Sequence, residues 1–167
     1  MRKISLMMLV LLLTMGVKAQ DEKFKALFMY NFTKYLEWPQ AKQAGDFTIG
    51  VIGNSPIVGE LNAIAARKSV GAQKIVVKEI SASDDVSKLH IVFVPEKNSD
   101  DAAQIASKTK SKGVLLITDK NGLGQSTSGI NFIKKDGKQS FEINNKHINE
   151  GGLKAAAQLA LLGVAID

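Results

Sequence analysis

The chain contains only two histidines, and they limit the chemistry it could perform. His90 opens an apolar segment and His147 lies near the start of a predicted helix, so we expect both to be structural. Their separation fits no recognisable zinc-ligand spacing. The chain has no cysteine, which excludes thiol catalysis and cysteine–metal sites. The sequence therefore predicts no metal site.

Serine and carboxylate chemistry has no clearer signature. No serine, histidine and aspartate can be singled out as a triad, because triads are recognised by geometry and not by order. Glu142 and Glu150 could form a carboxylate pair, but Glu142 lies on an alternating strand, where a solvated or salt-paired side chain is expected. We predict no catalytic residue and no cofactor. A hydrolase is the alternative that we rank last. It would need a cleft in which the pKa values of the catalytic groups are shifted.

Two glycine-containing segments could bind a ligand. Residues 53–56, Gly-Asn-Ser-Pro, join a predicted strand to a helix, and such junctions can hold an anion at the carboxyl edge of a sheet. Asn54 and Ser55 therefore mark a candidate ligand crevice, although an ordinary turn is the interpretation we favour. The segment 122–129 is interpreted as a flexible loop that either closes over a ligand or connects two strands. Neither segment matches a dinucleotide or phosphate-loop pattern.

The most distinctive segment is a predicted aromatic helix at residues 21–36, which Pro39 ends. Its apolar residues recur at helical spacing. The side chains expected in the core are Phe24, Phe28 and Phe32. Tyr30 and Trp38 cannot both share that face, and an exposed aromatic beside Lys34 would suit a partner interface.

Strands and helices alternate through the middle of the chain. Strands are predicted at 47–52, 74–80, 90–94 and 114–118, and helices at 56–67 and 102–110. Ser55 is the expected N-cap of the first of these helices, and 99–101 are expected to cap the second. Alternation with short connections predicts a mostly parallel sheet with helices on both faces.

The pattern changes in the last third of the chain. Segments 130–134 and 139–143 alternate apolar and polar residues around Asp-Gly, which is a strong hairpin signal. From Asn145 onward apolar spacing predicts a terminal helix, which Gly151 and Gly152 could break near its start. The expected fold is a single three-layer α/β domain, Rossmann-like, with a mostly parallel sheet, a C-terminal antiparallel hairpin and a closing helix.

Residues 1–19 predict export. Arg2 and Lys3 precede an apolar Leu/Met/Val stretch, and Val17-Lys18-Ala19 offers a cleavage site, which is the pattern of a secretory signal. The stretch is short for a membrane span, which needs about 20 apolar residues; an uncleaved anchor is the alternative. Cleavage after Ala19 leaves one domain, 20–167, that is expected to be soluble.

The charge of the exported domain is modest. The signal removes three of the 22 basic residues, so 19 remain against 16 acidic ones. The lysines are scattered, with no arginine run and no basic stripe interleaved with aromatic residues. Nucleic-acid binding would need such a footprint, and we do not expect it.

Three blocks of the sequence resemble, in the right order, the YfiR/HmsC family of exported bacterial proteins. They are 30–39 (YNFTKYLEWP), 49–56 (IGVIGNSP), and a closing block formed by 129–133 (GINFI), 141–144 (FEIN) and 152–154 (GLK). The residues of interest within these blocks are Tyr30, Asn31, Lys34, Trp38, Asn131, Phe132 and Glu142.

The resemblance implies a periplasmic α/β protein that often forms homodimers. It also implies repression of an inner-membrane diguanylate cyclase through that enzyme's periplasmic sensor domain, so that release raises cyclic-di-GMP and favours biofilm formation. Well-known members carry disulfides, whereas this chain has no cysteine; redox control is not expected, and the target could be another membrane receptor such as a sensor kinase. On this hypothesis Trp38→Ala weakens partner binding and leaves the fold intact. The alternative is a periplasmic small-ligand receptor that uses the crevice near Asn54 and Ser55.

Overall fold

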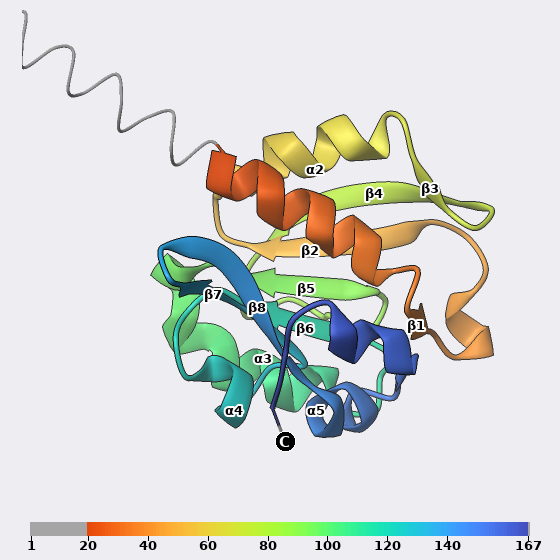
Figure 1. Ribbon diagram of the computed structural model, residues 1–167. Helices are drawn as coiled ribbons and strands as arrows, with labels where there is room; N and C mark the ends of the chain where they lie inside the picture. The colour runs from red at the N-terminus through yellow and green to blue at the C-terminus, as the bar shows by residue number, and fades with distance from the viewer. Residues whose placement is uncertain (1–19, 167) are drawn as a thin grey trace, which may run out of the picture.

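Five parallel strands form the centre of one sheet in the computed structural model, which describes residues 20–166 (Figure 1). The predicted signal peptide lies outside these residues. In chain order the strands are β2 (Phe47–Ile52), β4 (Gln73–Ile80), β5 (Ile91–Val94), β6 (Leu115–Thr118) and β7 (Ile130–Lys135). In space they are ordered β4-β2-β5-β6-β7, which confirms the predicted mostly parallel sheet. β2, β5 and β6 are buried along their whole length, as their apolar sequences require.

Further strands extend the sheet at both edges. β8 (Lys138–Asn144) pairs antiparallel with β7, and the predicted hairpin is confirmed. Its turn residues Asp136 and Gly137 have φ of 51° and 74°, the positive values that a tight Asp-Gly turn requires. β10 (Val164–Ile166) lies parallel to β8 at that edge, and β3 (Ser69–Val70) pairs with β4 at the other.

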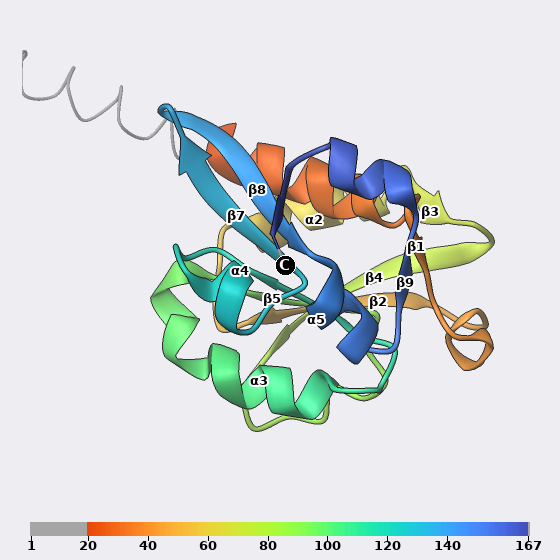
Figure 2. The same cartoon turned by 60° about the horizontal axis from the view of Figure 1, so that its bottom comes forward.

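Helices cover both faces of the sheet, as predicted. The N-terminal helix (residues 20–32) and α2 (Ile57–Ala65) cover one face, and α3 (Ala102–Thr109) covers the other (Figures 1 and 2). Alternate residues of a strand point to opposite faces. Phe93 of β5 accordingly joins the core under the N-terminal helix, whereas its neighbour Val92 joins the core under α3.

The aromatic side of the N-terminal helix packs on the hairpin. The ring of Phe28 lies 5.1 Å from that of Phe141, and the ring of Phe32 lies 6.1 Å from that of Phe132. Phe24 is 6.5 Å from Phe132. The three phenylalanines predicted for the core therefore do face it, and they join the first helix to the last third of the chain.

The N-terminal helix ends at residue 32, four residues earlier than predicted. The Thr33 hydroxyl donates to the Tyr30 carbonyl at 2.7 Å, and the chain then turns into β1 (Leu36–Glu37). β1 pairs antiparallel with β9 (Lys154–Ala155), beside which it is seen in Figure 2. A ladder formed with a distant segment thus overrides the local helical pattern.

The predicted terminal helix is wrong beyond its first turns. α5 (Asn145–Glu150) ends at the two glycines, and β9, a 3-10 segment η3 (Ala157–Leu161) and β10 follow. Gly152 has a φ of 86°, and a Cβ on Gly151 would lie 2.8 Å from the Val114 carbonyl oxygen. Both positions therefore require glycine, and the chain cannot continue as a helix through them.

Three smaller expectations also differ from the structure. The segment 122–129 is not simply a loop, because it contains the one-turn helix α4 (Leu123–Ser126). Ser55 makes no side-chain cap at the start of α2, where Pro56 occupies the N-cap position. Residues 99–101 belong to a 3-10 segment, η2 (Glu96–Asp101), and give α3 no side-chain cap.

A further short 3-10 segment, η1 (Gln40–Lys42), follows Pro39.

Candidate functional site

Trp38 lies in the core and not on the surface. It is 6% exposed, and its ring packs edge-on against Phe47 at 5.0 Å. The indole Nε1 donates to the His90 carbonyl oxygen at 3.3 Å. The β1–β9 ladder turns the chain inward just before this residue, so the expectation of an exposed aromatic at Trp38 is not met.

His90 supports Trp38 from within the core. Its ring stacks on Phe47 at 4.4 Å, its Nδ1 accepts from the Thr48 amide at 3.1 Å, and its Nε2 lies 2.7 Å from the Lys42 carbonyl oxygen. Since the amide can only donate and the carbonyl can only accept, the neutral ring carries its proton on Nε2. Burial lowers the pKa of His90, the hydrogen bond to the Lys42 carbonyl opposes this by less, and the Lys42 charge adds to the lowering. The contacts give this histidine a structural role.

Asn131 and Glu142 form part of a buried hydrogen-bond network. Asn131 is fully buried, its Nδ2 donates to Glu142 Oε2 at 2.9 Å, and its Oδ1 accepts from the Thr118 hydroxyl at 2.7 Å. Thr118 also bonds the Ser128 hydroxyl at 2.7 Å. The two residues face each other across β7 and β8. Phe132, the next residue, is 1% exposed, so this block of the motif ties the hairpin to the end of β6.

Tyr30 and Asn31, in the last turn of the N-terminal helix, lie beside Lys34 in the turn that follows it. Lys34 Nζ donates to Asn31 Oδ1 at 3.0 Å and lies 5.0 Å from the centre of the Tyr30 ring. Leu27 precedes Tyr30 by three residues, which places it on the same side of a helix, and it is 49% exposed. We call Leu27, Tyr30, Asn31 and Lys34 the helix stripe. Of the seven family-motif residues, it contains three.

The helix stripe has a second exposed apolar side chain in its neighbourhood. Leu161 is 83% exposed and belongs to η3, which lies beside the C-terminal half of the N-terminal helix in both views (Figures 1 and 2). The Ala156 amide, just before η3, donates to the Tyr35 carbonyl at 2.8 Å. This contact holds η3 close to the end of the helix.

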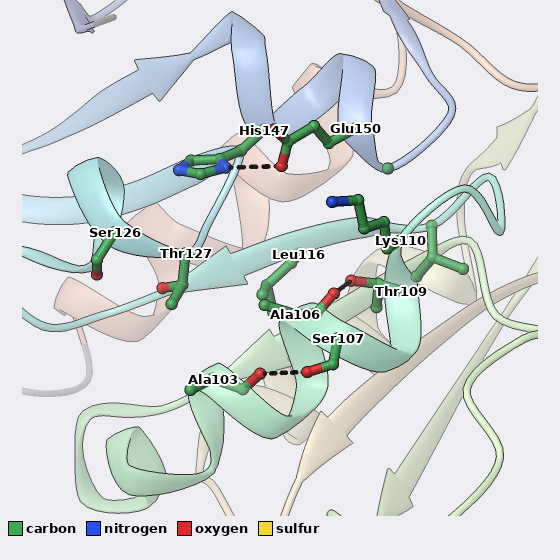
Figure 3. Close-up of a pocket in the computed structure, with 13 residues that line it drawn as sticks. Ala103, Ala106, Ser107, Thr109, Lys110, Leu116, Ser126, Thr127, His147 and Glu150 are labelled. Atoms are coloured by element: carbon green, nitrogen blue, oxygen red, sulfur yellow. Dashed lines mark hydrogen bonds and ion pairs between the residues drawn. The ribbon is translucent and has the colours of Figure 1, made fainter.

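A pocket of about 460 Å³ opens between α3, α4 and α5 (Figure 3). His147 and Glu150 line one side, with Nδ1 and Oε2 3.5 Å apart, and small side chains such as Ala106 of α3 line the other. The His147 Nε2 lies 3.2 Å from the Gln125 carbonyl oxygen, which occupies the position that a serine nucleophile would need. Glu142 and Glu150 have different partners, Asn131 and His147, so they do not act as a carboxylate pair.

A larger crevice, of about 730 Å³, lies at the carboxyl ends of β2, β5 and β6 and is lined in part by Lys25; we call it the Lys25 crevice. Lys25 of the N-terminal helix is 6% exposed. Its Nζ donates to Asp119 Oδ2 at 2.5 Å and to Glu22 Oε1 at 3.1 Å. Ser55 also lines this crevice. Its neighbour Asn54 lines a separate depression, so the two residues expected to share a ligand crevice are divided between two.

The segment 122–129 does not close over this crevice, contrary to the ligand-binding interpretation of the loop. Its residues Ser126, Thr127 and Gly129 line the pocket between α3, α4 and α5 instead. The reason is the helical turn of α4, which Asn144 holds by donating from Nδ2 to the Gly124 carbonyl at 3.0 Å.

Burial and charge act in opposite directions on the Lys25 cluster. Burial raises the pKa of Asp119, Lys25 lowers it by less, and Glu22 and Glu96 raise it further. Burial alone would lower the pKa of Lys25, but Asp119 and Glu22 outweigh it and raise the value. The two pKa values therefore rise for different reasons: burial dominates at Asp119, and the two neighbouring carboxylates prevail at Lys25. We expect Lys25 to remain protonated.

The sequence analysis missed the Lys25 cluster because Lys25 and Asp119 are 94 positions apart. One signal could have indicated it. Lys25 precedes Phe28, Met29 and Phe32 by three, four and seven residues, which places a lysine inside the apolar stripe of the helix. Within residues 20–166, no group of three histidine, aspartate or glutamate side chains is arranged to hold a metal ion.

The sequence profile of the YfiR/HmsC-like family matches residues 22–164. The chain belongs to the YfiR/HmsC-like family. The match spans the helix stripe, the buried motif residues and, apart from Asp21, the residues that line the Lys25 crevice. A search of curated proteins finds none that matches this chain.

Membership of the YfiR/HmsC-like family supports, in general terms, a periplasmic regulator of diguanylate cyclase signalling, and it identifies the chain with regulators and not with enzymes. The partner that it suggests is a membrane diguanylate cyclase. In the part of the chain that the structure describes, no helix has the length and apolar character to cross a membrane.

Proposed function

We propose that this YfiR/HmsC-like protein represses a membrane diguanylate cyclase by binding the enzyme's periplasmic domain, and so restrains cyclic-di-GMP signalling and biofilm formation. The family match over 22–164 carries the proposal. The contacts of His90 and His147 support a regulatory role and not a catalytic one, because Nε2 of each ring lies next to a backbone carbonyl oxygen. Export and cleavage after Ala19 are part of the proposal, and the mass of the protein recovered from the periplasm tests them.

The helix stripe is the surface that we propose for the cyclase. Aromatic residues are enriched in the buried centre of protein interfaces, and Tyr30 presents a ring whose contact with Lys34 is already formed. Leu27 adds apolar area. A partner surface with an acidic group facing Lys34 would be complementary. Trp38, Asn131 and Phe132 are buried, so in this proposal they support the fold beneath the stripe.

Capture of the cyclase from membranes tests the proposal. Residues 20–167 are immobilised and incubated with solubilised membranes of the cells that make the protein, and the retained proteins are identified by mass spectrometry. We expect a diguanylate cyclase with a periplasmic domain. Lys34→Glu should abolish its retention, because it reverses the charge and removes the contact with Tyr30. Lys112→Glu makes the same charge change at an exposed site between α3 and β6 and should retain the enzyme.

The same variants separate repression from mere binding in cells. Deletion of the gene should raise cyclic-di-GMP and biofilm mass, and the wild type and Lys112→Glu should restore both, whereas Lys34→Glu should not. Recovery of a sensor kinase in place of a cyclase would assign another target. If folded bait retains neither, or if deletion leaves cyclic-di-GMP unchanged, the repressor proposal is wrong. A homodimer remains a prediction, which light scattering of the same protein tests.

A further inference from the structure

The Lys25 crevice lies at the point where the strand order reverses. From β2 the chain passes through α2 to β4 on one side, and then returns through β5 to β6 on the other. In open α/β sheets, small molecules bind outside the carboxyl ends of the strands at such a point. The crevice volume of about 730 Å³ falls within the roughly 300–1,000 Å³ of small-molecule sites.

The inner part of the crevice has fewer cations than carboxylates. Among the contacts of residues 20–166, Lys25 uses Oε1 of Glu22 and Oδ2 of Asp119, so each carboxylate retains a second oxygen. Glu96 also lines the crevice, but it is exposed like Lys97, so Lys25, Glu22 and Asp119 set the charge of the inner part. A second cation placed among them would be attracted by more than one of these groups.

The lysines at the mouth of the crevice do not supply that cation. Lys134 pairs with Asp21 at 3.0 Å, and Lys120 donates to the Ser99 hydroxyl at 2.9 Å. Lys97 and Lys120 are both exposed, where water and salt screen their charges.

Apolar side chains complete the walls of the crevice. Pro56 follows β2, Pro95 follows β5, and Phe132 and Ile133 belong to β7. Small-molecule sites commonly combine such walls with a few convergent polar groups. Such a crevice suits a ligand whose apolar carbon skeleton carries one positively charged group.

We propose that the Lys25 crevice binds a small organic molecule through a protonated amine, which lies beside Asp119 and Glu22 while its carbon skeleton lies against Pro56 and Pro95. Lys25 stays in place and holds the two carboxylates for the incoming amine. The site is separate from the helix stripe, and the proposal does not depend on the cyclase.

Three probes of one shape and different charge test the ligand class. Isothermal titration of residues 20–167 is carried out with 2-phenylethylamine, 2-phenylethanol and phenylacetate at millimolar concentrations. We expect the amine to bind at least tenfold more tightly than the alcohol, because charge-assisted hydrogen bonds are about twice as strong as neutral ones. Phenylacetate should bind most weakly. Raising the salt concentration should weaken amine binding.

Two variants and one control locate the binding. Asp119→Asn removes one charge and keeps the shape, and it should weaken amine binding by roughly tenfold, a loss of one charge-assisted contact. Because this change disturbs the buried pair with Lys25, Glu22→Gln provides a milder test with the pair intact, and it should weaken binding in the same direction. Asp136→Asn, in the exposed hairpin turn, makes the matched charge change and should leave the affinity unaltered.

The outcomes are decisive in both directions. Equal binding of amine and alcohol, tighter binding of phenylacetate, or no heat from the amine with folded protein would each overturn the proposal. So would amine binding that survives in both Asp119→Asn and Glu22→Gln.

Discussion

Two groups of family-motif residues lie in contrasting surroundings, although members of both, such as Lys34 and Trp38, come from one stretch of sequence. Tyr30 and Lys34 are on the helix stripe, where Lys34 contacts the Tyr30 ring and Asn31, and the half-buried Tyr30 also packs against the edge of the core. Trp38 and Asn131 are buried, and their polar atoms bond to groups from distant parts of the chain. The difference shows that one motif can join residues that hold the fold and residues that could meet a partner.

This contrast assigns different consequences to substitutions in the two groups. Loss of a buried side chain removes packing and leaves polar partners without hydrogen bonds, so its main effect should be on stability. Loss of a side chain from the helix stripe removes contacts that water can replace. For the exposed members, Leu27 and Lys34, the main effect should therefore be on partner binding.

The largest expected effect on stability is that of Trp38→Ala. It removes the ring that packs on Phe47 and the donor to His90, and it should lower the free energy of unfolding by about 3–5 kcal/mol, as for other buried large aromatic residues. Urea denaturation followed by circular dichroism measures this loss. Trp38→Phe is the matched control, because it keeps a ring and loses the indole donor, and it should cost less.

A different result would move Trp38 to the other group. If Trp38→Ala lowered the free energy of unfolding by less than about 1 kcal/mol and yet lost the cyclase, the original expectation of a direct partner contact would stand, and the contrast between the groups would fail at this residue.

A smaller effect on stability is expected from the protonation of His90, which packs beside the buried Trp38. A proton on Nδ1 of His90 would face the Thr48 amide, and burial lowers the pKa of this histidine. The unfolded chain, with a histidine pKa of about 6.5, therefore takes up the proton first as the pH falls. Stability from His90 is complete above about pH 6.5 and decreases below it, towards the lowered folded-state pKa.

His90→Gln isolates this contribution, since an amide can still accept from Thr48 and donate to Lys42 but does not titrate. Denaturation between pH 7.5 and 5 should show a decline for the wild type that is reduced in the variant. Asp119 works in the opposite direction, because its raised pKa lets the folded protein bind a proton first; it is present in both proteins and cancels in the comparison. Identical pH profiles would remove His90 from the explanation.

The sequence predicted the parts of the fold that local patterns decide. The apolar runs of β5 and β6 and the Asp136-Gly137 turn each have a local signature, and each was predicted. The Ala/Leu-rich stretch 153–164 has high helix propensity, yet it forms β9, η3 and β10. There the two glycines end the helix, as the sequence allowed, but the pairing of β9 with the distant β1 is not visible in a local window.

The candidate sites were harder to predict, for a related reason. The family resemblance identified the motif residues, but whether they are buried depends on pairings made elsewhere: Trp38 is turned inward beside the β1–β9 ladder. The Lys25–Asp119 pair joins a helix to the end of β6. The helix and the end of β6 meet only because of the order of the parallel strands in the sheet. The spacing of residues along the chain does not reveal that order.

The smallest expected effect is that of Lys34→Ala on stability. Its ammonium group contacts Tyr30 and Asn31 at the surface; exposed cation–π contacts contribute about 0.5–1 kcal/mol, and water replaces part of that when the lysine is removed. The free energy of unfolding should change by no more than about 0.5 kcal/mol, the usual range for surface positions. The same denaturation series measures it beside Trp38→Ala. A loss above about 1.5 kcal/mol, larger than an exposed contact can account for, would place Lys34 with the residues that hold the fold. The failure of Lys34→Glu to retain a cyclase would then report damage to the protein, and the helix stripe would lose its claim to be a binding surface.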